Sequence, residues 1–392
     1  SGAKVANSGK ELAEQVDWSD GEKSKFNYMW LRDNCPTAHD KDSRHRMFNI
    51  LKVSQNINPK KFLVTDDGKL QIEWSEGDHT SLYDPSWLRE NCYTLKNKKK
   101  FVSPYQKWDN SLEKNLNSIE VDHDEIMDSE SGLAKWLEFL HFKGIAIVKN
   151  APVEKESAFP LLKRISHVRE TFFKTPFDVI NIPKPNNSAY TAHALRNHLD
   201  LPYFETPPGY QFLHCLINSA TGGNSSAVDG FAVAEYLKKN HPETFKTLTE
   251  IPVKFIDNDY TQNTLRHFHS TPITLTKDKD YNDIRFSVAT MDVLDCHPDD
   301  MEKVYKAHHV LGNLLHDDRF QIQFRLGPGD IFSFNNRRVL HGRTEFDPNS
   351  GHRHLQGYYM DRDEIIGRSY RDIKFRKISS SRNSRRNHHE PC

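Results

Sequence analysis

The sequence predicts a mainly β protein with helices. A small β-rich domain at residues 1–110 is expected to precede a larger domain at residues 111–375, built as a double-sheet barrel with helices on its outside. Two observations favour this class. Short strand-like segments are interleaved with helical segments, without the regular βαβ rhythm of a parallel sheet. The chain is also 392 residues long, which suits one large and one small domain.

The N-terminal domain is marked by a hairpin pattern. Residues 62–65 and 70–74 have strand character and flank an Asp-Asp-Gly turn. Residues 28–35 and 85–92 share the pattern W-L-R-[DE]-N-C, which we interpret as two helix or turn ends that pack Trp and Leu on one small core; the alternative is a weak internal repeat. Residues 96–100, KNKKK, are typical of a solvated linker.

The larger domain contains both helical and strand patterns. Helical periodicity marks residues 132–142, 156–170, 229–239, a segment opening at Pro242, and 298–315. Strand patterns mark residues 144–148, 211–217, 320–326 and 330–334, and the last two are expected to form a hairpin. Residues 376–392 are rich in basic residues, Ser and Asn, and are expected to be a disordered tail.

The composition argues against several classes of partner. Lys and Arg together number 54 and so do Asp and Glu, so the net charge gives no reason to expect nucleic acid or membrane binding. No apolar run approaches the roughly 20 residues that a membrane helix needs. Five scattered cysteines favour a reducing compartment, so we expect a cytoplasmic protein. Ser1-Gly2 is typical of residues left by cloning. The alternative to a cytoplasmic location is therefore a protein whose targeting peptide has been removed.

The stretch 190–200, YTAHALRNHLD, holds the first candidates for chemistry. His198 and Asp200 form an H-x-D pair, and on an extended chain such residues point to the same side. His341 follows a strand pattern far downstream and offers a third ligand. Two His and one carboxylate occupy one face of an Fe(II) ion and leave three positions for a bidentate oxo-acid and O₂. Arg353 offers a fork for the far carboxylate of that acid.

An H-x-D pair alone is weak evidence in a chain with 21 His. Taken with the whole order of motifs, the pattern is more specific. WLRDNC near the start, PPGYQFLHC after the H-x-D, TGGNS…VDGF, NRRVLHGR and RHLQGYY together resemble the γ-butyrobetaine dioxygenase and trimethyllysine dioxygenase family. The resemblance runs from about residue 20 to about residue 370. It implies an Fe(II)- and 2-oxoglutarate-dependent hydroxylase with a double-stranded β-helix (jelly-roll) core in residues 111–375.

The resemblance also implies a role for individual residues. It implies that iron is held by His198, Asp200 and His341. It implies that Arg353 binds the C5 carboxylate of 2-oxoglutarate, with Asn187 and Leu213 near this cosubstrate. An aromatic cage for a trimethylammonium head corresponds here to Phe173, Phe177, Tyr190 and Tyr359. Such a cage is physically sensible because ring faces attract a quaternary cation that cannot donate hydrogen bonds.

The N-terminal domain departs from the family pattern. Members often hold zinc there through three Cys and one His, whereas in this chain only Cys35 and His79 match, and the other two ligand positions are Thr37 and Asp40. Since His39 or His45 could substitute, Cys35, His39 and His79 are the candidate zinc ligands. The alternative is a module held by its Trp and Leu core without metal.

A second departure falls on the side that should read the anionic end of the substrate. The γ-butyrobetaine enzymes carry Asn residues near the segment 284–290, where this chain has Ser287 and Val288, with Arg285 just before. Leu201 follows Asp200 where the animal enzymes have tyrosine, and we count it as a substrate-side residue. The anion is therefore left open between the γ-butyrobetaine carboxylate, a different carboxylate and a phosphonate.

The expected activity is hydroxylation of a small trimethylammonium compound, with γ-butyrobetaine (to carnitine) as the first choice. Trimethylaminoethylphosphonate and trimethyllysine are the alternatives. The expected cofactors are Fe(II), 2-oxoglutarate and O₂, with ascorbate in support, and zinc is left open. A non-catalytic quaternary-ammonium-binding protein and a zinc hydrolase are the rival classes. Similar enzymes are dimers, so we expect a homodimer.

Overall fold

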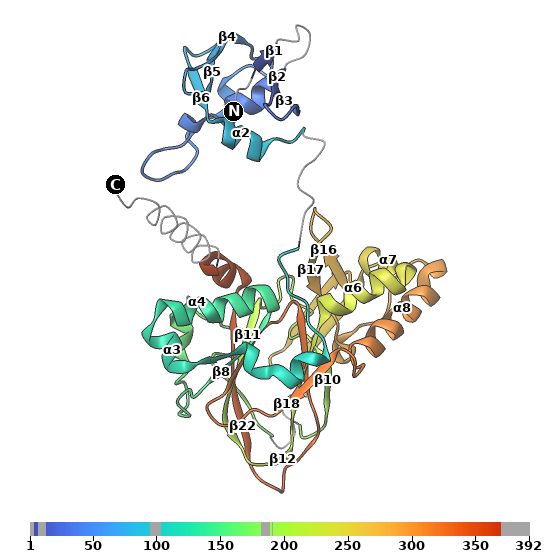
Figure 1. The fold of residues 1–392 in the computed structure, drawn as a ribbon. Coiled ribbons are helices and arrows are strands. Elements are labelled where there is room, and N and C mark those ends of the chain that lie inside the picture. Colours follow the sequence, from blue (N-terminus) through green and yellow to red (C-terminus); the bar gives the residue numbers. More distant parts are fainter. Residues whose placement is uncertain (1–3, 7–12, 95–102, 182–188, 190, 370–392) are drawn as a thin grey trace. The chain divides into compact units, whose positions relative to one another are not determined.

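A computed structural model describes residues 4–6, 13–94, 103–181, 189 and 191–369. The chain divides into two compact units, Ser1–Val102 and Ser103–Cys392, each described here by itself (Figure 1). The predicted linker at 96–100 and the predicted tail at 376–392 lie outside the described residues. Among the described residues, no helix combines the length and the apolar character needed to cross a membrane.

The first unit contains two three-stranded antiparallel sheets and two short helices. Its strands are β1 (Lys4–Ala6), β2 (Ala13–Asp17) and β3 (Lys23–Asn27) in one sheet and β4 (Pro59–Val64), β5 (Leu70–Trp74) and β6 (Thr80–Tyr83) in the other. Strands β4 and β5 form the predicted hairpin. The two W-L-R segments are helices α1 (Tyr28–Asp33) and α2 (Pro85–Asn91), and their Trp and Leu side chains pack into one core, as interpreted from the sequence.

The second unit is built around two sheets. A six-stranded sheet has the order β7-β8-β19-β11-β22-β9, and a four-stranded sheet has the order β10-β20-β13-β18. Their strands are β7 (Glu120–Asp122), β8 (Ile145–Lys149), β19 (Ile331–Asn335), β11 (Tyr210–Asn218), β22 (Arg353–Met360) and β9 (Phe177–Val179), then β10 (Leu195–His198), β20 (Val339–Arg343), β13 (Ser225–Asp229) and β18 (Gln321–Phe324). All these pairings are antiparallel except that of β7 with β8.

Three apolar layers hold these sheets and their helices together. The layer between the sheets contains inward residues of both, including Ile147, Phe332 and Phe334 from the larger sheet and Ile322 from the smaller one. Successive residues of a strand face opposite sides, so Ala146 and its equivalents on the larger sheet belong to a second layer. Because both faces of β8 are covered, it reads as an unbroken apolar run in the sequence.

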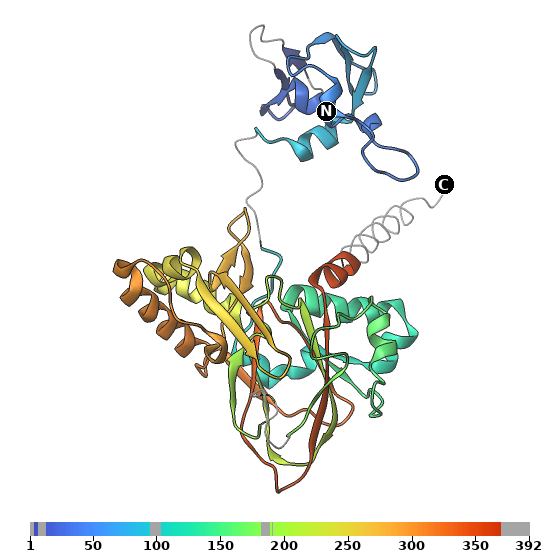
Figure 2. The same cartoon turned by 180° about the vertical axis from the view of Figure 1, so that it is seen from behind.

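Helices cover the outer face of each sheet (Figures 1 and 2). Helices α3 (His123–Asp128), α4 (Glu130–Glu138) and α5 (Phe159–Lys163) pack on the six-stranded sheet. Helices α6 (Gly230–Asn240), α7 (Pro242–Glu250) and α8 (Met301–Leu314) pack on the four-stranded sheet. Asp229 caps α6 as predicted, since its Oδ1 accepts a hydrogen bond of 3.0 Å from the Phe231 N–H. Short pairs β12 (Thr221–Gly222) with β21 (Phe346–Asp347), β14 (Val253–Asp259) with β15 (Thr264–Ser270) and β16 (Ile273–Leu275) with β17 (Tyr281–Ile284) complete the unit.

Two sequence predictions are wrong at the level of elements. The expected hairpin of residues 320–326 and 330–334 does not form, because β18 pairs with β13 in one sheet while β19 pairs with β8 and β11 in the other. The Gly-Pro-Gly turn between them carries the chain from sheet to sheet, and Gly329 has a φ of +88° there. The helix expected at 156–170 is limited to α5, because Arg169 instead forms a bridge to Tyr359 of the sheet.

Candidate active site

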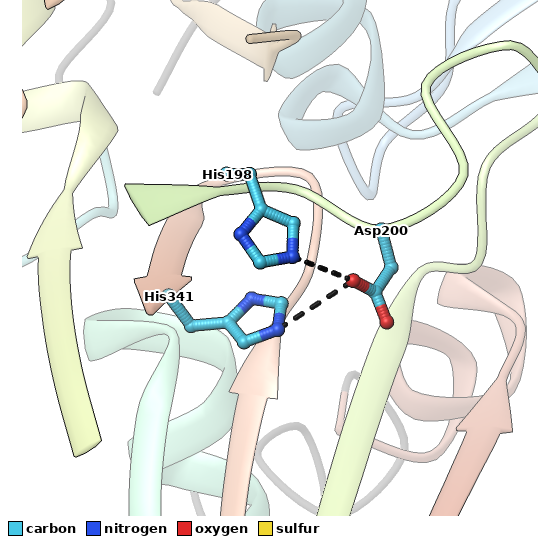
Figure 3. Close-up of side chains that lie close together, drawn as sticks. All are labelled: His198, Asp200 and His341. Atoms are coloured by element: carbon cyan, nitrogen blue, oxygen red, sulfur yellow. Dashed lines mark ion pairs between the residues drawn. The ribbon is translucent and has the colours of Figure 1, made fainter. Parts of the chain in front are cut away.

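The H-x-D pair and the distant histidine meet where two strands run side by side. Strands β10 and β20 are antiparallel neighbours, and His198 lies opposite His341. Figure 3 shows both imidazoles turned toward the carboxylate of Asp200. The Nε2 atoms of His198 and His341 lie 3.2 and 3.5 Å from Asp200 Oδ1. Within the described ranges, this is the one group of three or more His, Cys, Asp or Glu whose ligand atoms all lie within 4.8 Å of one another.

The surroundings prepare these three groups to be metal ligands. His198 Nδ1 lies 2.7 Å from the Arg196 carbonyl, which can only accept, so Nδ1 carries a proton and Nε2 is the atom directed at Asp200. Burial lowers the pKa of His341 to about 3, so this imidazole is neutral at pH 7. Burial opposes ionisation of Asp200, but the two imidazoles hold the pKa of its carboxyl well below the usual range. One carboxylate and two imidazoles with convergent donor atoms fit a ferrous ion on one face.

The pKa of His198 responds to the same neighbour. Burial disfavours its charged form, yet the hydrogen bond and the charge of Asp200 together raise the pKa above the ordinary value. Such mutual stabilisation of a histidine and a carboxylate is what a metal ion replaces when it binds.

A small cavity of about 70 Å³ continues from the triad toward Arg353. Leu213 lines it, as do Gln211 and Arg343. Burial lowers the pKa of Arg353 to about 10, and neither its Nε nor the Oε1 of Gln211 has a hydrogen-bond partner within the described part of the chain. A partly buried guanidinium beside an apolar wall suits a carboxylate on a short carbon chain.

A larger cavity of about 370 Å³ also borders the triad, through His198 and Asp200. Phe173, Phe177, Leu201 and Tyr359 line it. The rings of Phe177 and Tyr359 are stacked with centroids 4.9 Å apart, and Phe173 lies 5.9 Å from Phe177. The predicted Tyr190 and Asn187 lie outside the described residues.

Residues 287–290 also line this cavity, and Val288 in this segment is exposed. Arg285 does not face the cavity. Its guanidinium donates hydrogen bonds of 2.7 to 2.9 Å to the carbonyls of Pro202, Phe204 and Glu205, and it therefore holds that segment in place.

The candidate zinc ligands of the first unit are not all brought together. Cys35 Sγ lies 3.3 Å from His79 Nε2, and the Thr37 hydroxyl lies 3.1 Å from the thiol and 3.3 Å from the imidazole. His39 does not complete a three-ligand group with them. The hydroxyl of Thr37 therefore completes a hydrogen-bonded cluster at the place where a third thiolate would be needed.

Sequence reasoning missed three residues that complete the site. Arg343 and Gln211 line the small cavity, and the side chain of Asn336 contacts the backbone of Asp200. Asn336 and Arg343 are the first and last residues of the motif NRRVLHGR, and Gln211 belongs to PPGYQFLHC, so the signal was present in the sequence. Of these two motifs, the sequence analysis assigned a role only to His341 and Leu213. The spacing of residues gives no sign that a polar side chain such as Gln211 will be buried in a site.

Comparisons with known proteins agree with this geometry. Residues 105–359 match the model of the taurine catabolism dioxygenase TauD, TfdA family, and residues 5–93 match the gamma-butyrobetaine hydroxylase-like N-terminal domain. The chain is 37% identical over 359 residues to the gamma-butyrobetaine dioxygenase of Pseudomonas sp. (strain AK-1), a match that covers 90% of this chain and 92% of the relative. It is 31% identical to the human gamma-butyrobetaine dioxygenase, covering 90% and 92%.

A mitochondrial trimethyllysine dioxygenase from Mus musculus is 32% identical, covering 88% of this chain and 82% of the relative. Among solved structures, asparagine oxygenase in complex with Fe(II), hydroxyasparagine and succinate has a TM-score of 0.46 at 15% identity, covering 62% of this chain and 93% of that one. The chain thus belongs to the TauD, TfdA family, within its γ-butyrobetaine and trimethyllysine dioxygenase branch, and is an iron- and 2-oxoglutarate-dependent dioxygenase.

Proposed function

We propose that this enzyme hydroxylates γ-butyrobetaine. The observation that carries the proposal is that His198 and Asp200 line both cavities, the small one that reaches Arg353 and the large one that contains the aromatic rings. The small cavity ends in a partly buried cation, and the large one is walled by aromatic rings. An anionic cosubstrate and a cationic substrate can therefore approach the same metal from different sides.

The side chains divide the work as follows in this proposal. His198, Asp200 and His341 hold Fe(II), and Arg353 pairs with the C5 carboxylate of 2-oxoglutarate while Leu213 packs on its carbon chain. The iron and the cosubstrate, when bound, activate O₂ for insertion into a C–H bond. The protein's contribution is to fix which C–H bond lies nearest the metal, because positioning decides selectivity. Asn187 is assigned to the cosubstrate side on the family resemblance alone.

The aromatic wall is the proposed site of the trimethylammonium head. Phe173, Phe177 and Tyr359 offer ring faces to a cation, an interaction of about 0.5–2 kcal/mol per ring when water is excluded. The same lining contains the carboxylate of Asp200 and one arginine of the described residues, Arg196, which is exposed. We add Tyr190 to the cage on the family resemblance.

The two facing sheets are the proposed double-stranded β-helix, and the first unit is the proposed counterpart of the N-terminal domain of γ-butyrobetaine hydroxylases. The switch from β18 to β19 supports the first assignment, because a jelly roll passes its chain between two sheets in this way.

A panel of substrates tests the proposal. Succinate release is measured with γ-butyrobetaine, trimethyllysine and trimethylaminoethylphosphonate under identical conditions. We expect the largest kcat/KM with γ-butyrobetaine. A preference for the phosphonate or for trimethyllysine would leave the assignment as a hydroxylase intact but change the proposed substrate. Ser287 and Leu201 would then be the first residues to test as determinants of substrate selectivity.

Ligand variants separate an enzyme from a binding protein. His198→Ala and Asp200→Ala are each expected to abolish succinate release, because removing one donor leaves only two on the metal. Anaerobic titration of the wild type with Fe(II) and 2-oxoglutarate should produce a charge-transfer absorption band. Binding of γ-butyrobetaine without that band would identify a non-catalytic binding protein instead.

We further propose that the enzyme is a homodimer, as expected from similar enzymes. Sedimentation equilibrium of the full chain tests this directly, since the monomer mass is 45.6 kDa.

A further inference from the structure

Asp200 sits at a strained point of the backbone. It follows the end of β10, and the next residue, Leu201, has a φ of +59°. A branched L residue in this left-handed region is disfavoured by contact between its Cβ and the backbone. Such a conformation persists only when the surroundings hold it, so the contacts of Asp200 indicate what fixes the metal ligand.

The backbone of Asp200 is held by one buried side chain. Asn336 Oδ1 accepts a hydrogen bond of 2.8 Å from the Asp200 N–H, and Asn336 Nδ2 donates one of 3.0 Å to the Asp200 carbonyl. The same Nδ2 donates to the carbonyl of Pro208 at 3.0 Å. Because Asn336 is fully buried, this clamp fixes both peptide groups beside the ligand.

The carboxylate of Asp200 is held by a second side chain. The Tyr359 hydroxyl donates a hydrogen bond of 2.6 Å to Asp200 Oδ2. The other oxygen, Oδ1, is the one that faces the Nε2 atoms of both histidines. A hydrogen bond to one oxygen stops rotation of the carboxylate, so only the other oxygen is presented to a metal.

The ring of Tyr359 meanwhile belongs to the large cavity. It stacks on Phe177, and only 2% of Tyr359 is exposed. We propose that Tyr359 serves the site in two separable ways: its ring walls the cation cavity, and its hydroxyl is a positioning group that orients Asp200 for the metal, in concert with the Asn336 clamp. This inference deepens the proposed function and rests on its metal site.

The variant Tyr359→Phe separates the two roles, because it removes the hydroxyl and keeps the ring. Co(II) affinity is measured anaerobically from the visible absorption of the bound ion, without turnover. Loss of an outer hydrogen bond to a metal ligand typically weakens metal binding by about 10–100-fold, and we expect a loss in this range. Affinity for γ-butyrobetaine in the presence of Co(II) at saturation should change by no more than about 2-fold, because ring-face attraction does not need the hydroxyl.

The chain offers a matched control at the next position of the same strand. Tyr358 is also fully buried in β22, and its hydroxyl has no hydrogen-bond partner within the described residues. Tyr358→Phe should leave Co(II) affinity unchanged. Phe177→Leu should show the opposite pattern to Tyr359→Phe: weaker γ-butyrobetaine binding and unaltered Co(II) affinity.

Each outcome decides between defined alternatives. Equal Co(II) affinity of Tyr359→Phe and wild type would overturn the positioning role while leaving the proposed function intact. Parallel loss of Co(II) and γ-butyrobetaine binding in Tyr359→Phe, with an unchanged circular dichroism spectrum, would overturn the separation of roles. Absence of Co(II) and Fe(II) binding by the wild type would instead refute the proposed function itself.

Discussion

The guanidinium carbons of Arg343 and Arg353 approach the same ring, that of Phe346, at 4.9 and 5.9 Å from its centroid. Burial lowers the pKa of each to about 10, and the charge of Arg353 adds to the effect on Arg343. Arg343 donates to the carbonyls of Thr191 and His193 at 2.7 Å. Within the described residues no salt bridge joins either arginine to a carboxylate, so the pair creates a positive cavity that an anion would stabilise.

Replacing Arg353 with lysine keeps the charge and removes the fork. We expect the KM for 2-oxoglutarate to rise about 10–100-fold. This rise corresponds to a loss of about 1.4–2.8 kcal/mol of binding free energy, which a bidentate contact can supply. Steady-state kinetics at saturating substrate measure this. Arg319→Lys, a change at an exposed arginine paired with Asp317, is the control. An unchanged KM would remove Arg353 from the cosubstrate site.

The ring of Phe177 in the large cavity is expected to contribute to binding of the trimethylammonium group. Phe177→Leu keeps apolar bulk and removes the ring face, so the KM for a trimethylammonium substrate should rise about 3–30-fold. Competitive inhibition by a neutral analogue, in which a tert-butyl group replaces trimethylammonium, should change much less. If both ligands weaken equally, the ring contributes shape and not charge recognition.

At this scale the sequence predicted the candidate ligands but not the side chains that support them. His198, Asp200, His341 and Arg353 were all named from spacing and resemblance, and the structure places the first three within 4.8 Å. The hydroxyl of Tyr359 was not assigned to Asp200, because the two residues are far apart in sequence and an aromatic in a family motif suggested only its ring. The zinc candidates show the reverse, since Cys35 and His79 lie 3.3 Å apart but His39 does not join them in a three-ligand group.

Strand β22 pairs with β9 at a glycine. Gly357 pairs with Phe177, and a Cβ at residue 357 would lie 2.1 Å from the Phe177 ring. Gly357→Ala is therefore expected to displace the ring, destabilise the fold by about 1–3 kcal/mol and raise the substrate KM, with Co(II) affinity retained. Urea denaturation and the two titrations check this. Gly367→Ala, where nothing lies within 4 Å of the new Cβ, is the control.

Asp283 of β17 joins two other segments of the second unit. Arg337 contacts it at 2.6 and 2.5 Å, and Arg362 contacts it at 2.6 Å. Burial disfavours the charged carboxyl, yet the two arginines hold its pKa below the ordinary value. A depressed pKa means that the stabilisation is present above the unfolded value of about 3.9 and is lost as the pH falls below it.

Asp283→Asn should consequently cost about 3–5 kcal/mol at pH 7, the usual effect of breaking a buried pair. The difference from the wild type should shrink as the pH falls below about 4. Denaturant unfolding at pH 7 and pH 3 measures both. Asp20→Asn, at an exposed pair with Arg89, should cost less than about 1 kcal/mol. A difference that grows toward acid would contradict the assignment.

Element prediction succeeded where periodicity and turn residues agreed. The β4–β5 hairpin and the capped helix α6 are examples, since their signals are local. The hairpin expected around Gly327–Gly329 failed because strands of either sheet have the same apolar pattern, so the sequence cannot say which partner each one takes. Pairings such as β11 with β22 join residues far apart in the chain, and local patterns contain no information on them.

At the scale of the whole molecule, each unit has its own apolar core. One cluster joins residues between Val16 and Cys92, and the others join residues from Tyr105 onward. Trp74 is buried in the first core and donates a 2.8 Å hydrogen bond to Ser81. Trp74→Ala should destabilise the first unit by about 3–5 kcal/mol, while Co(II) affinity of the second unit is retained. Parallel loss of metal binding would show that the two cores unfold as one.

The register that places His198 opposite His341 has a consequence for how the chain acquires its structure. The chain between His198 and His341 must close into a long loop before β10 and β20 can pair. This closure costs conformational entropy, so strands so far apart in sequence tend to associate slowly. Before these strands pair, the three candidate ligands of a ferrous ion are not held close together. The His198–Asp200–His341 group is therefore complete only once β10 and β20 have paired.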